Sequence, residues 1–526
     1  MEKKKIIALL VCIVVGGILV SGIILADWMS PSEEASKEVP KQELVVGYDQ
    51  DIGSIKPGSV AGLWTLTFLV YDGLTEIDQD YNKKPGLAES WEMSQDGRVW
   101  TFHLRKGVRF HDGTKFDSED VKFTFETFLE KPFGSLRFLE KIECPDSYTV
   151  NFILKKPSYL LASDLAMQNT AIISSTSPVD EKSGKVIEAI GTGPFKVEKW
   201  VKGQEIVLVR NDEYWKDAPK LERLIFKVIP DPETRIMALE SGQIDLLYCK
   251  GLITAIPRLL KNPKIKIDRK LGQNTVVIFL KTQKEPFDDL QVRKAINYAI
   301  DVNTSVKSLL GDVAVPAEHI FSPAFKHFNN PEVKPYGHDP EKARHLLSKA
   351  GWRDTDGDGV LEKNEKEFRV TLTFDARDPG YQIMAQAVQN QLKKVGINVR
   401  LQPVDYAALR KSLTSGEFDM LMVREWYIPH DDPSNHYYAY YHSSGILKIY
   451  SNDKLDQLID QLEVTIDQTE RLRLHYGIQK EIMDNAPAIF LYHPYNIVAA
   501  ERSVKDVKAS VGFWQDYESL EKAWIE

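Results

Sequence analysis

The sequence is poor in cysteine and lacks the short motifs of common catalytic sites. Three cysteines occur in 526 residues, and no Cys-x-x-Cys or Cys/His spacing is present, which excludes a cysteine-based zinc site. There is no Gly-x-Ser-x-Gly elbow, no His-Glu-x-x-His helix and no phosphate-loop lysine motif. We therefore expect a protein that is not an enzyme. Whether Cys144 and Cys249 form a disulfide or remain two buried thiols stays open at this point.

Positive charge is also in deficit. Lys and Arg number 67 against 76 Asp and Glu, a formal net charge of −9. The charge is more negative still without residues 1–26, which carry three lysines and one glutamate. An acidic body disfavours nucleic acid and anionic lipid surfaces as partners. It fits an exported protein with a cationic or neutral ligand.

A long hydrophobic run stands at the start of the chain. Residues 6–26 are apolar apart from glycine and serine, and they follow three lysines. The run is close to the ~20 residues that span a bilayer and exceeds the ~7–15 of a cleavable signal peptide. The preceding lysines predict that the amino end stays inside and the rest is exported. We expect residues 1–26 to be a membrane anchor, with cleavage near Ala26 as the alternative, and residues 27–42 to be a flexible tether.

Strand and helix patterns alternate beyond the tether without an internal repeat, which predicts α/β layers. Helices are predicted to begin at Asp231-Pro232 and Asp339-Pro340, because an aspartate N-cap there precedes proline at the first helical position. A chain of 526 residues is longer than a single hydrophobic core usually supports, so at least two lobes are expected. The predicted strands are 43–48, 99–104, 149–154, 205–210, 223–228, 275–280, 369–374 and 398–403.

Several segments resemble a known family. Residues 87–123, LAESWEMSQDGRVWTFHLRKGVRFHDGTKFDSEDVKF, resemble the signature region of the extracellular solute-binding proteins, family 5, of peptide and nickel ABC importers. The resemblance extends over residues 44–526. Further matches follow in the family's order: GTGPF (191–195), RNDEYW (210–215), VIPDPETRIMALESGQIDLLY (228–248), VRKAINYAID (292–301) and PEKARHLLSKAGW (340–352).

The resemblance implies a two-lobed, periplasmic-binding-protein-like α/β fold of class II, with two crossover strands as a hinge. Lobe one is expected at 44–275 plus 492–526, with an extra small domain near 72–185, and lobe two at 276–491. The implied protein is an extracytoplasmic monomer that encloses a small ligand and delivers it to an ABC permease and its ATPase. A sensory ectodomain without a permease and an anchored hydrolase are the alternatives from other classes.

The family's ligand segment corresponds here to residues 424–442, REWYIPHDDPSNHYYAYYH. Peptide-binding members carry an aspartate about three residues after the tryptophan, which pairs with the peptide's α-amine. Pro429 stands at that place after Trp426. This proline, with Arg424 near the tryptophan, resembles the nickel-binding branch, and His430 and His442 are candidate nitrogen donors. Nickel or a nickel chelate is therefore the expected ligand, and a short peptide is the alternative.

The nickel branch also implies arginines that face the ligand. Arg137 lies several residues out of register with one of them, and the segment 166–171, AMQNTA, lacks another. Tyrosines 437, 438, 440 and 441 are expected to pack within lobe two rather than to contact the ligand. The candidate ligand-binding residues are Trp426, His430, His442, Arg424 and Arg137.

A separate metal site is indicated by residues 354–365, DTDGDGVLEKNE, which match the calcium-loop pattern D-x-D-x-D-G-x5-E. A strand rather than a second helix is predicted to follow, so the loop stands alone. We expect a structural Ca²⁺, with an acidic solvated turn as the alternative. The ligands would be carboxylates of Asp354, Asp356 and Asp358, the Val360 carbonyl, Glu362 directly or through water, and a bidentate Glu365.

Overall fold

The computed structural model describes residues 41–526, except 50–56, 58–63, 79–80, 129–133, 180–187, 250–251, 326, 426–431, 446–449, 451 and 513–515. The expected anchor at 1–26 and nearly all of the tether at 27–42 lie outside the described residues. In the part of the chain that is described, no helix combines the length and apolarity needed to cross a bilayer.

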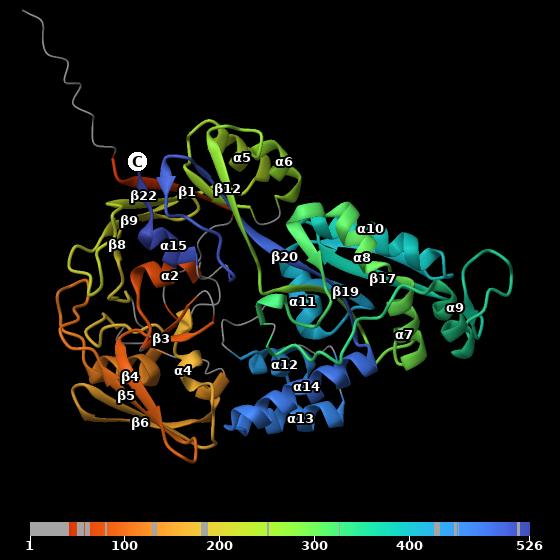
Figure 1. Ribbon diagram of the computed structural model, residues 1–526, viewed down its shortest axis with the longest axis horizontal. Coiled ribbons are helices and arrows are strands. Elements are labelled where there is room, and N and C mark those ends of the chain that lie inside the picture. The colour runs from red at the N-terminus through yellow and green to blue at the C-terminus, as the bar shows by residue number, and fades with distance from the viewer. Residues whose placement is uncertain are drawn as a thin grey trace, which may run out of the picture. The chain divides into compact units, whose positions relative to one another are not determined.

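One mixed sheet runs through both halves of residues 42–526 (Figure 1). Two further strands, β12 (Ile265–Leu271) and β14 (Ala314–Pro316), pair with β20 off the main path. Across the sheet the order is β18 (Asn398–Val404), β17 (Arg369–Asp375), β19 (Met420–Glu425), β13 (Thr275–Leu280), β20 (Ala488–Glu501), β11 (Leu246–Tyr248), β1 (Glu43–Tyr48), β10 (Arg223–Val228), β9 (Glu205–Arg210) and β8 (Phe195–Val201).

Two neighbouring chain segments pass between the halves. β20 pairs with β13 through residues 488–492 and with β12 through residues 495–501. β12 itself continues through residues 272–274 into β13. The crossings lie beside the lobe boundaries expected at 275–276 and 491–492. Two adjacent crossover strands between packed halves are the geometry of a hinge.

Lobe one is built on β1, which pairs in parallel with β10 and β11. Helices α2 (Trp64–Val70) and α15 (Asp516–Lys522) pack over one core, and α5 (Pro232–Glu240) and α6 (Ile256–Leu259) over a second. The start of α5 is the predicted one: the Asp231 carboxylate accepts the Thr234 N–H at 2.8 Å, with Pro232 in the first turn.

The extra domain of lobe one has its own antiparallel sheet in the order β4-β5-β7-β6. Its strands are β4 (Ala88–Met93), β5 (Val99–Leu104), β7 (Thr149–Leu154) and β6 (Leu139–Asp146). Trp100, Phe102 and Phe152 lie in its core. Helix α3 (Ser118–Phe123) begins at Asp117 with a capping box, and the short helices η2 (Gly134–Phe138) and α4 (Leu161–Asp164) follow. Much of the family signature therefore forms scaffold.

In lobe two, helices cover both faces of the sheet, which is why β13 is apolar on both sides. On one face lie α7 (Leu290–Ala299), α8 (Val302–Leu309), α9 (Pro340–Lys349) and α10 (Pro379–Lys393). On the other lie α11 (Tyr406–Ser415), α12 (Ser434–Tyr441), α13 (Asp453–Val464) and α14 (Gln468–Asn485).

The strands expected from pattern are those of β1, β5, β7, β9, β10, β13, β17 and β18. Cys144 and Cys249 are both free thiols, which settles the question left open above. Three small hairpins complete the described strands: β2 (Thr75–Ile77) with β3 (Lys83–Pro85), β15 (Glu362–Lys363) with β16 (Lys366–Glu367), and β21 (Val504–Lys505) with β22 (Trp524–Ile525).

Candidate functional site

Arg424 stands near the end of β19, which β13 separates from the hinge strand β20 in the sheet. Its Nη2 donates to Oδ1 of Asn496 at 3.0 Å. The Asn496 amide nitrogen donates to the carbonyls of Ser510 and Val511 at 2.9 and 2.8 Å. The two carbonyls fix the orientation of the Asn496 amide, so its oxygen is the atom turned toward the guanidinium. The arginine is thereby held at the crossing between the lobes.

Arg424 is half-buried and has no ion pair with a carboxylate among the described residues, and its buried Nε has no hydrogen-bond partner there. Two buried phenols, Tyr381 of α10 and Tyr492 of β20, lie within its electrostatic reach. Burial raises the pKa of both phenols, and the Arg424 charge works against that rise. A half-buried guanidinium with a free donor is a site for an anion, above all a carboxylate.

Two further candidates from the sequence meet at Tyr438 of α12. The Arg137 guanidinium, on η2, lies 4.2 Å from the Tyr438 ring centroid and pairs with Glu463 of α13. His442, which follows α12, stacks on the same ring at 4.7 Å. Its Nδ1 accepts the Ser444 N–H at 3.0 Å, and its Nε2 is 3.3 Å from Asp460. Because Nδ1 accepts a hydrogen bond, the proton of the neutral His442 ring lies on Nε2, which is buried and has no hydrogen-bond partner among the described residues. In this tautomer neither ring nitrogen offers a lone pair to a metal.

Trp426 and His430 lie outside the described residues. Of the five candidates, Arg137 and His442 are brought together, and no described contact joins either to Arg424. Tyr437, Tyr440 and Tyr441 are buried in the lobe-two core, and Tyr438 packs against it, so the expected packing role of this cluster is confirmed.

Sequence reasoning missed the polar network that follows the ligand segment. Asp432 is buried, and its Oδ2 accepts from Nε and Nη2 of Arg471 at 3.0 and 2.7 Å, while Nε2 of His475 lies 3.2 Å from Oδ1. Although burial acts to raise the pKa of Asp432, the charges of His475 and Arg471 hold it well below its usual range. This network fixes α14 to the residue after the undescribed segment 426–431.

A second buried carboxylate was also missed, directly before Trp426. Glu425 accepts the Tyr441 hydroxyl at 2.9 Å, and Nε2 of His436 is 3.5 Å from its other oxygen. No spacing rule in the sequence would have found either network, because each carboxylate and its partners lie on different elements. Asp432 precedes α12 and its partners lie on α14, whereas Glu425 ends β19 and its partners lie on α12.

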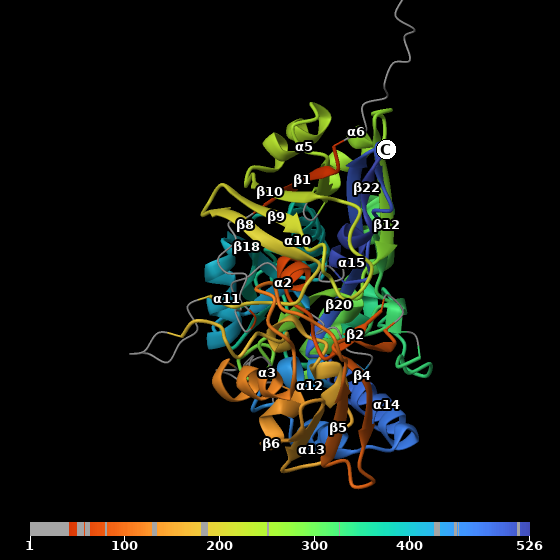
Figure 2. The same ribbon diagram turned by 90° about the vertical axis from the view of Figure 1, so that its left-hand side faces the viewer.

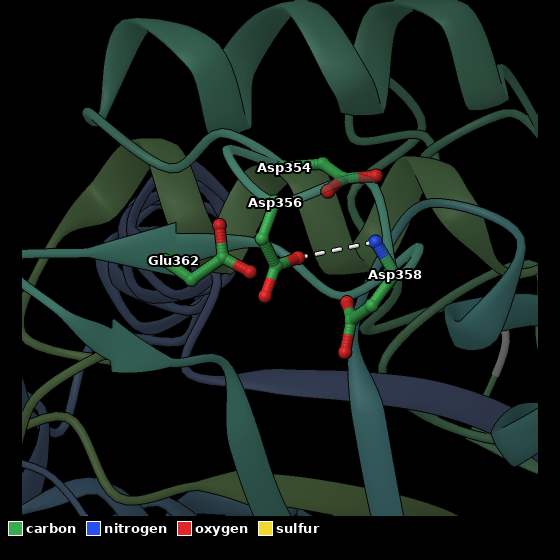
Figure 3. A group of neighbouring side chains, drawn as sticks. All are labelled: Asp354, Asp356, Asp358 and Glu362. Atoms are coloured by element: carbon green, nitrogen blue, oxygen red, sulfur yellow. Dashed lines mark hydrogen bonds between the residues drawn. The ribbon is translucent and has the colours of Figure 1, made fainter.

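The acidic loop lies between α9 and β16 (Figure 3). Asp354, Asp356, Asp358 and Glu362 each offer an oxygen, and these oxygens lie within 4.8 Å of one another. Asp354 accepts from the N–H groups of Gly357 and Gly359 at 2.7 and 3.1 Å, and both glycines have positive φ. Glu365 is not in this group: it sits with Asn364 at positive φ in the turn between β15 and β16. The oxygens suit a hard cation such as Ca²⁺.

A hollow of about 410 Å³ opens elsewhere on lobe two, lined by Lys281, Lys284 and Phe418 among others. It lies at the start of β19, the opposite end from Arg424. The ammonium of Lys284 is already paired with Asp419 at 2.6 Å. We assign no ligand to this hollow.

The two lobes and the paired crossover strands define a protein of the two-lobed ligand-binding class. Residues 82–448 match the bacterial extracellular solute-binding proteins, family 5, and this chain belongs to that family. It is a substrate-binding protein of an ABC importer of this type.

Individual relatives differ in their ligands. The oligopeptide-binding protein AppA of Bacillus subtilis is 29% identical, covering 100% of this chain and 99% of its own. Its structure with a nonapeptide has a TM-score of 0.77 over 92% of this chain. The nickel-binding periplasmic protein of Escherichia coli is 30% identical over 80% of this chain and 82% of its own. NikA of Brucella suis, solved with Fe(III)-EDTA, has a TM-score of 0.83 at 29% identity, covering 92% of this chain and 100% of its own.

These likenesses confirm the expected two-lobed α/β fold and the family. The relatives are solute-binding proteins and not enzymes. Nickel and peptide relatives stand at similar identity, so the family leaves the ligand open.

Proposed function

We propose that this protein binds a small carboxylate-bearing ligand between its lobes, in the first place a nickel chelate, and presents it to an ABC permease. The observation that carries the proposal is that Arg424 has no ion pair with a carboxylate, and no hydrogen-bond partner at Nε, among the described residues. A bare nickel ion would be repelled by a guanidinium at the site, whereas the carboxylate of a chelating acid would neutralise it. The chelator would supply the donors for nickel, which fits a His442 whose Nδ1 lone pair already accepts the Ser444 N–H.

Binding would act through the hinge. A ligand that contacts both lobes stabilises the closed arrangement in which the two lobes approach each other. Arg424 lies near the end of a lobe-two strand, and its partner Asn496 lies on β20 just beyond the crossing at 493–494. A carboxylate bound to Arg424 would therefore be close to the crossing segments. Closure would then form the surface that the permease recognises.

A short peptide is the second candidate. The support is the 29% identity to AppA over the full length of this chain. A peptide's terminal carboxylate would use Arg424 in the same way as a chelator. Against it stands Pro429, at the position where the resemblance would require an aspartate for the α-amine.

The deciding experiment is mass spectrometry with metal analysis of the ligand that co-purifies with residues 43–526. Nickel with a small amino-acid chelator supports the proposal, and a peptide ladder without metal promotes the second candidate. Thermal shift with nickel plus L-histidine, nickel alone and a dipeptide pool provides the matched measurement. A shift with nickel alone that equals the chelate shift would overturn the carboxylate argument.

We also propose that residues 1–26 anchor the protein and that residues 354–365 hold a structural Ca²⁺. The first rests on the span-length apolar run behind three lysines. The second is supported by the convergent oxygens of Asp354, Asp356, Asp358 and Glu362. Unlike the twelve-residue loop pattern, the proposed site does not include Glu365 as a ligand.

A further inference from the structure

We propose that Arg137, Tyr438 and Glu463 form a clasp between the lobes that stabilises the closed state and slows ligand release. The inference rests on the proposed function for the role of closure. It assigns Arg137 an effect on ligand affinity that acts through lobe closure and needs no contact with the ligand.

The three residues come from the two lobes. Arg137 belongs to η2 of the extra domain in lobe one, whereas Tyr438 and Glu463 belong to α12 and α13 of lobe two. Arg137 Nη2 donates to Glu463 Oε1, its Nε donates to its own turn at the Gly134 carbonyl at 3.1 Å, and its guanidinium covers the Tyr438 ring. A planar guanidinium that is both stacked on a ring and ion-paired loses little side-chain conformational entropy for each contact that it makes.

The pair is largely withdrawn from solvent. The side chains of Arg137 and Glu463 are 28% and 12% exposed. Burial raises the pKa of Glu463 even with Arg137 beside it, and Asp460 adds to the rise while His442 opposes it. Glu463 without Arg137 would therefore be an uncompensated charge in the closed state, and both groups would be hydrated in the open state. The ion pair thus distinguishes the two states.

Other contacts follow the same seam. Nδ2 of Asn435, on α12, donates to Asp164 Oδ1 of α4 at 3.2 Å. Nε2 of Gln468, on α14, donates to the Tyr159 hydroxyl at 3.0 Å, and Arg471 lies 5.0 Å from the Tyr159 ring centroid. Each of these contacts joins the extra domain to α12 or α14. The clasp is therefore one part of a polar seam.

The seam lies away from β12 in both ribbon views, although another part of lobe one reaches a crossing segment, where the Tyr81 hydroxyl donates to Oε1 of Gln273 at 2.5 Å. In Figures 1 and 2 the extra domain, with β4, β5 and β6, lies beside α12 and α13 at the lower end of both views, and β12 lies higher. Rotation about the crossings at 272–274 and 493–494 separates distant groups most, so these contacts break early when the lobes part. The extra domain thereby acquires a role in closure beyond its own fold.

The test is a double-mutant cycle on full-length protein. Arg137→Gln and Glu463→Gln should each raise the dissociation rate constant of nickel-histidine about tenfold. Each should also lower the fraction of ligand-free protein in the closed state, which small-angle scattering or inter-lobe fluorescence transfer measures. The double variant should release the ligand no faster than either single variant, because the second change breaks no further ion pair and, after Arg137→Gln, removes the uncompensated Glu463 charge. Arg137→Lys keeps the charge but loses the planar guanidinium on the Tyr438 ring, so it should restore the wild-type rate only in part.

The matched control is Glu143→Gln, which breaks the exposed Lys141–Glu143 pair within lobe one and should change neither quantity. Additive effects in the double variant, or single variants that match wild type in both rate and closed fraction, would overturn the clasp. If nickel-histidine does not bind wild type, the proposed ligand fails. The closed fraction and the release of the co-purified ligand then still decide the clasp.

Discussion

Arg424 and Asn496 join the last residues of a lobe-two strand to the strand that carries the chain back into lobe one. In the 3.0 Å hydrogen bond between them, one guanidinium nitrogen of Arg424 donates to the neutral side-chain amide of Asn496. The amide nitrogen of Asn496 donates in turn to the carbonyls of Ser510 and Val511. The described residues supply no ion pair for the Arg424 charge, and its Nε has no hydrogen-bond partner among them. Arg424 is thus held in a fixed orientation by a neutral partner, and its positive charge is available for an anionic ligand.

Replacing Arg424 by Gln should weaken nickel-histidine binding about 10–100-fold, because a hydrogen bond to a charged group contributes ~1.5–3 kcal/mol. Isothermal titration measures the loss. The exposed Arg473→Gln, which only breaks an exposed pair with Glu470, is the control and should bind like wild type. Equal affinity of Arg424→Gln and wild type would remove Arg424 from the site.

The C-terminal helix gives a pH prediction. Burial raises the pKa of Glu521 from 4.5 to about 7, with Lys216 opposing the shift and Asp72 and Glu76 adding to it. Because the folded pKa lies above the unfolded one, the stabilising effect is complete below about pH 4.5 and is lost as pH rises through about 7. Glu521→Gln should therefore unfold at a higher temperature than wild type at pH 8, by on the order of 1–2 kcal/mol after allowance for partial exposure.

At pH 4 the two proteins should unfold at the same temperature, since the carboxyl is neutral in both states. Glu417→Gln, at an exposed position, is the control at both pH values. A Glu521→Gln variant no more stable than wild type at pH 8 would mean that the carboxylate is well solvated.

The anchor gives a topological prediction. Protease added to intact cells should cut within residues 27–42 and release a soluble body, because that stretch is polar and rich in Pro, Ser and Glu. Immunoblotting of the supernatant and membrane fractions measures this. Full-length chain in the cytosolic fraction would contradict it.

The sequence predicts local features well and contacts between distant residues poorly. The start of α5 at Asp231-Pro232 follows from neighbouring residues, and the structure has it as predicted. The Arg137–Glu463 pair joins residues 326 positions apart, and the pairing of Arg471 with Asp432 depends on how α14 packs. Periodicity carries no information on such pairs. The resemblance pointed to Arg137 and His442 as ligand residues, but which way a side chain turns is decided by packing around Tyr438.

The acidic loop gives the last prediction. Millimolar Ca²⁺ should raise the melting temperature of wild type, since a lone loop of this kind binds in the range of extracellular modules, ~10⁻⁴–10⁻³ M. Asp354→Ala and Glu362→Gln should abolish the rise, because both carboxylates belong to the convergent group. Glu365→Gln is the matched control: it lies in the β15–β16 turn outside that group and should keep the rise. Cargo affinity should stay unchanged in all three variants. If Glu365→Gln alone removes the calcium response, the loop rearranges into the full twelve-residue pattern on binding, and the four-carboxylate assignment is wrong.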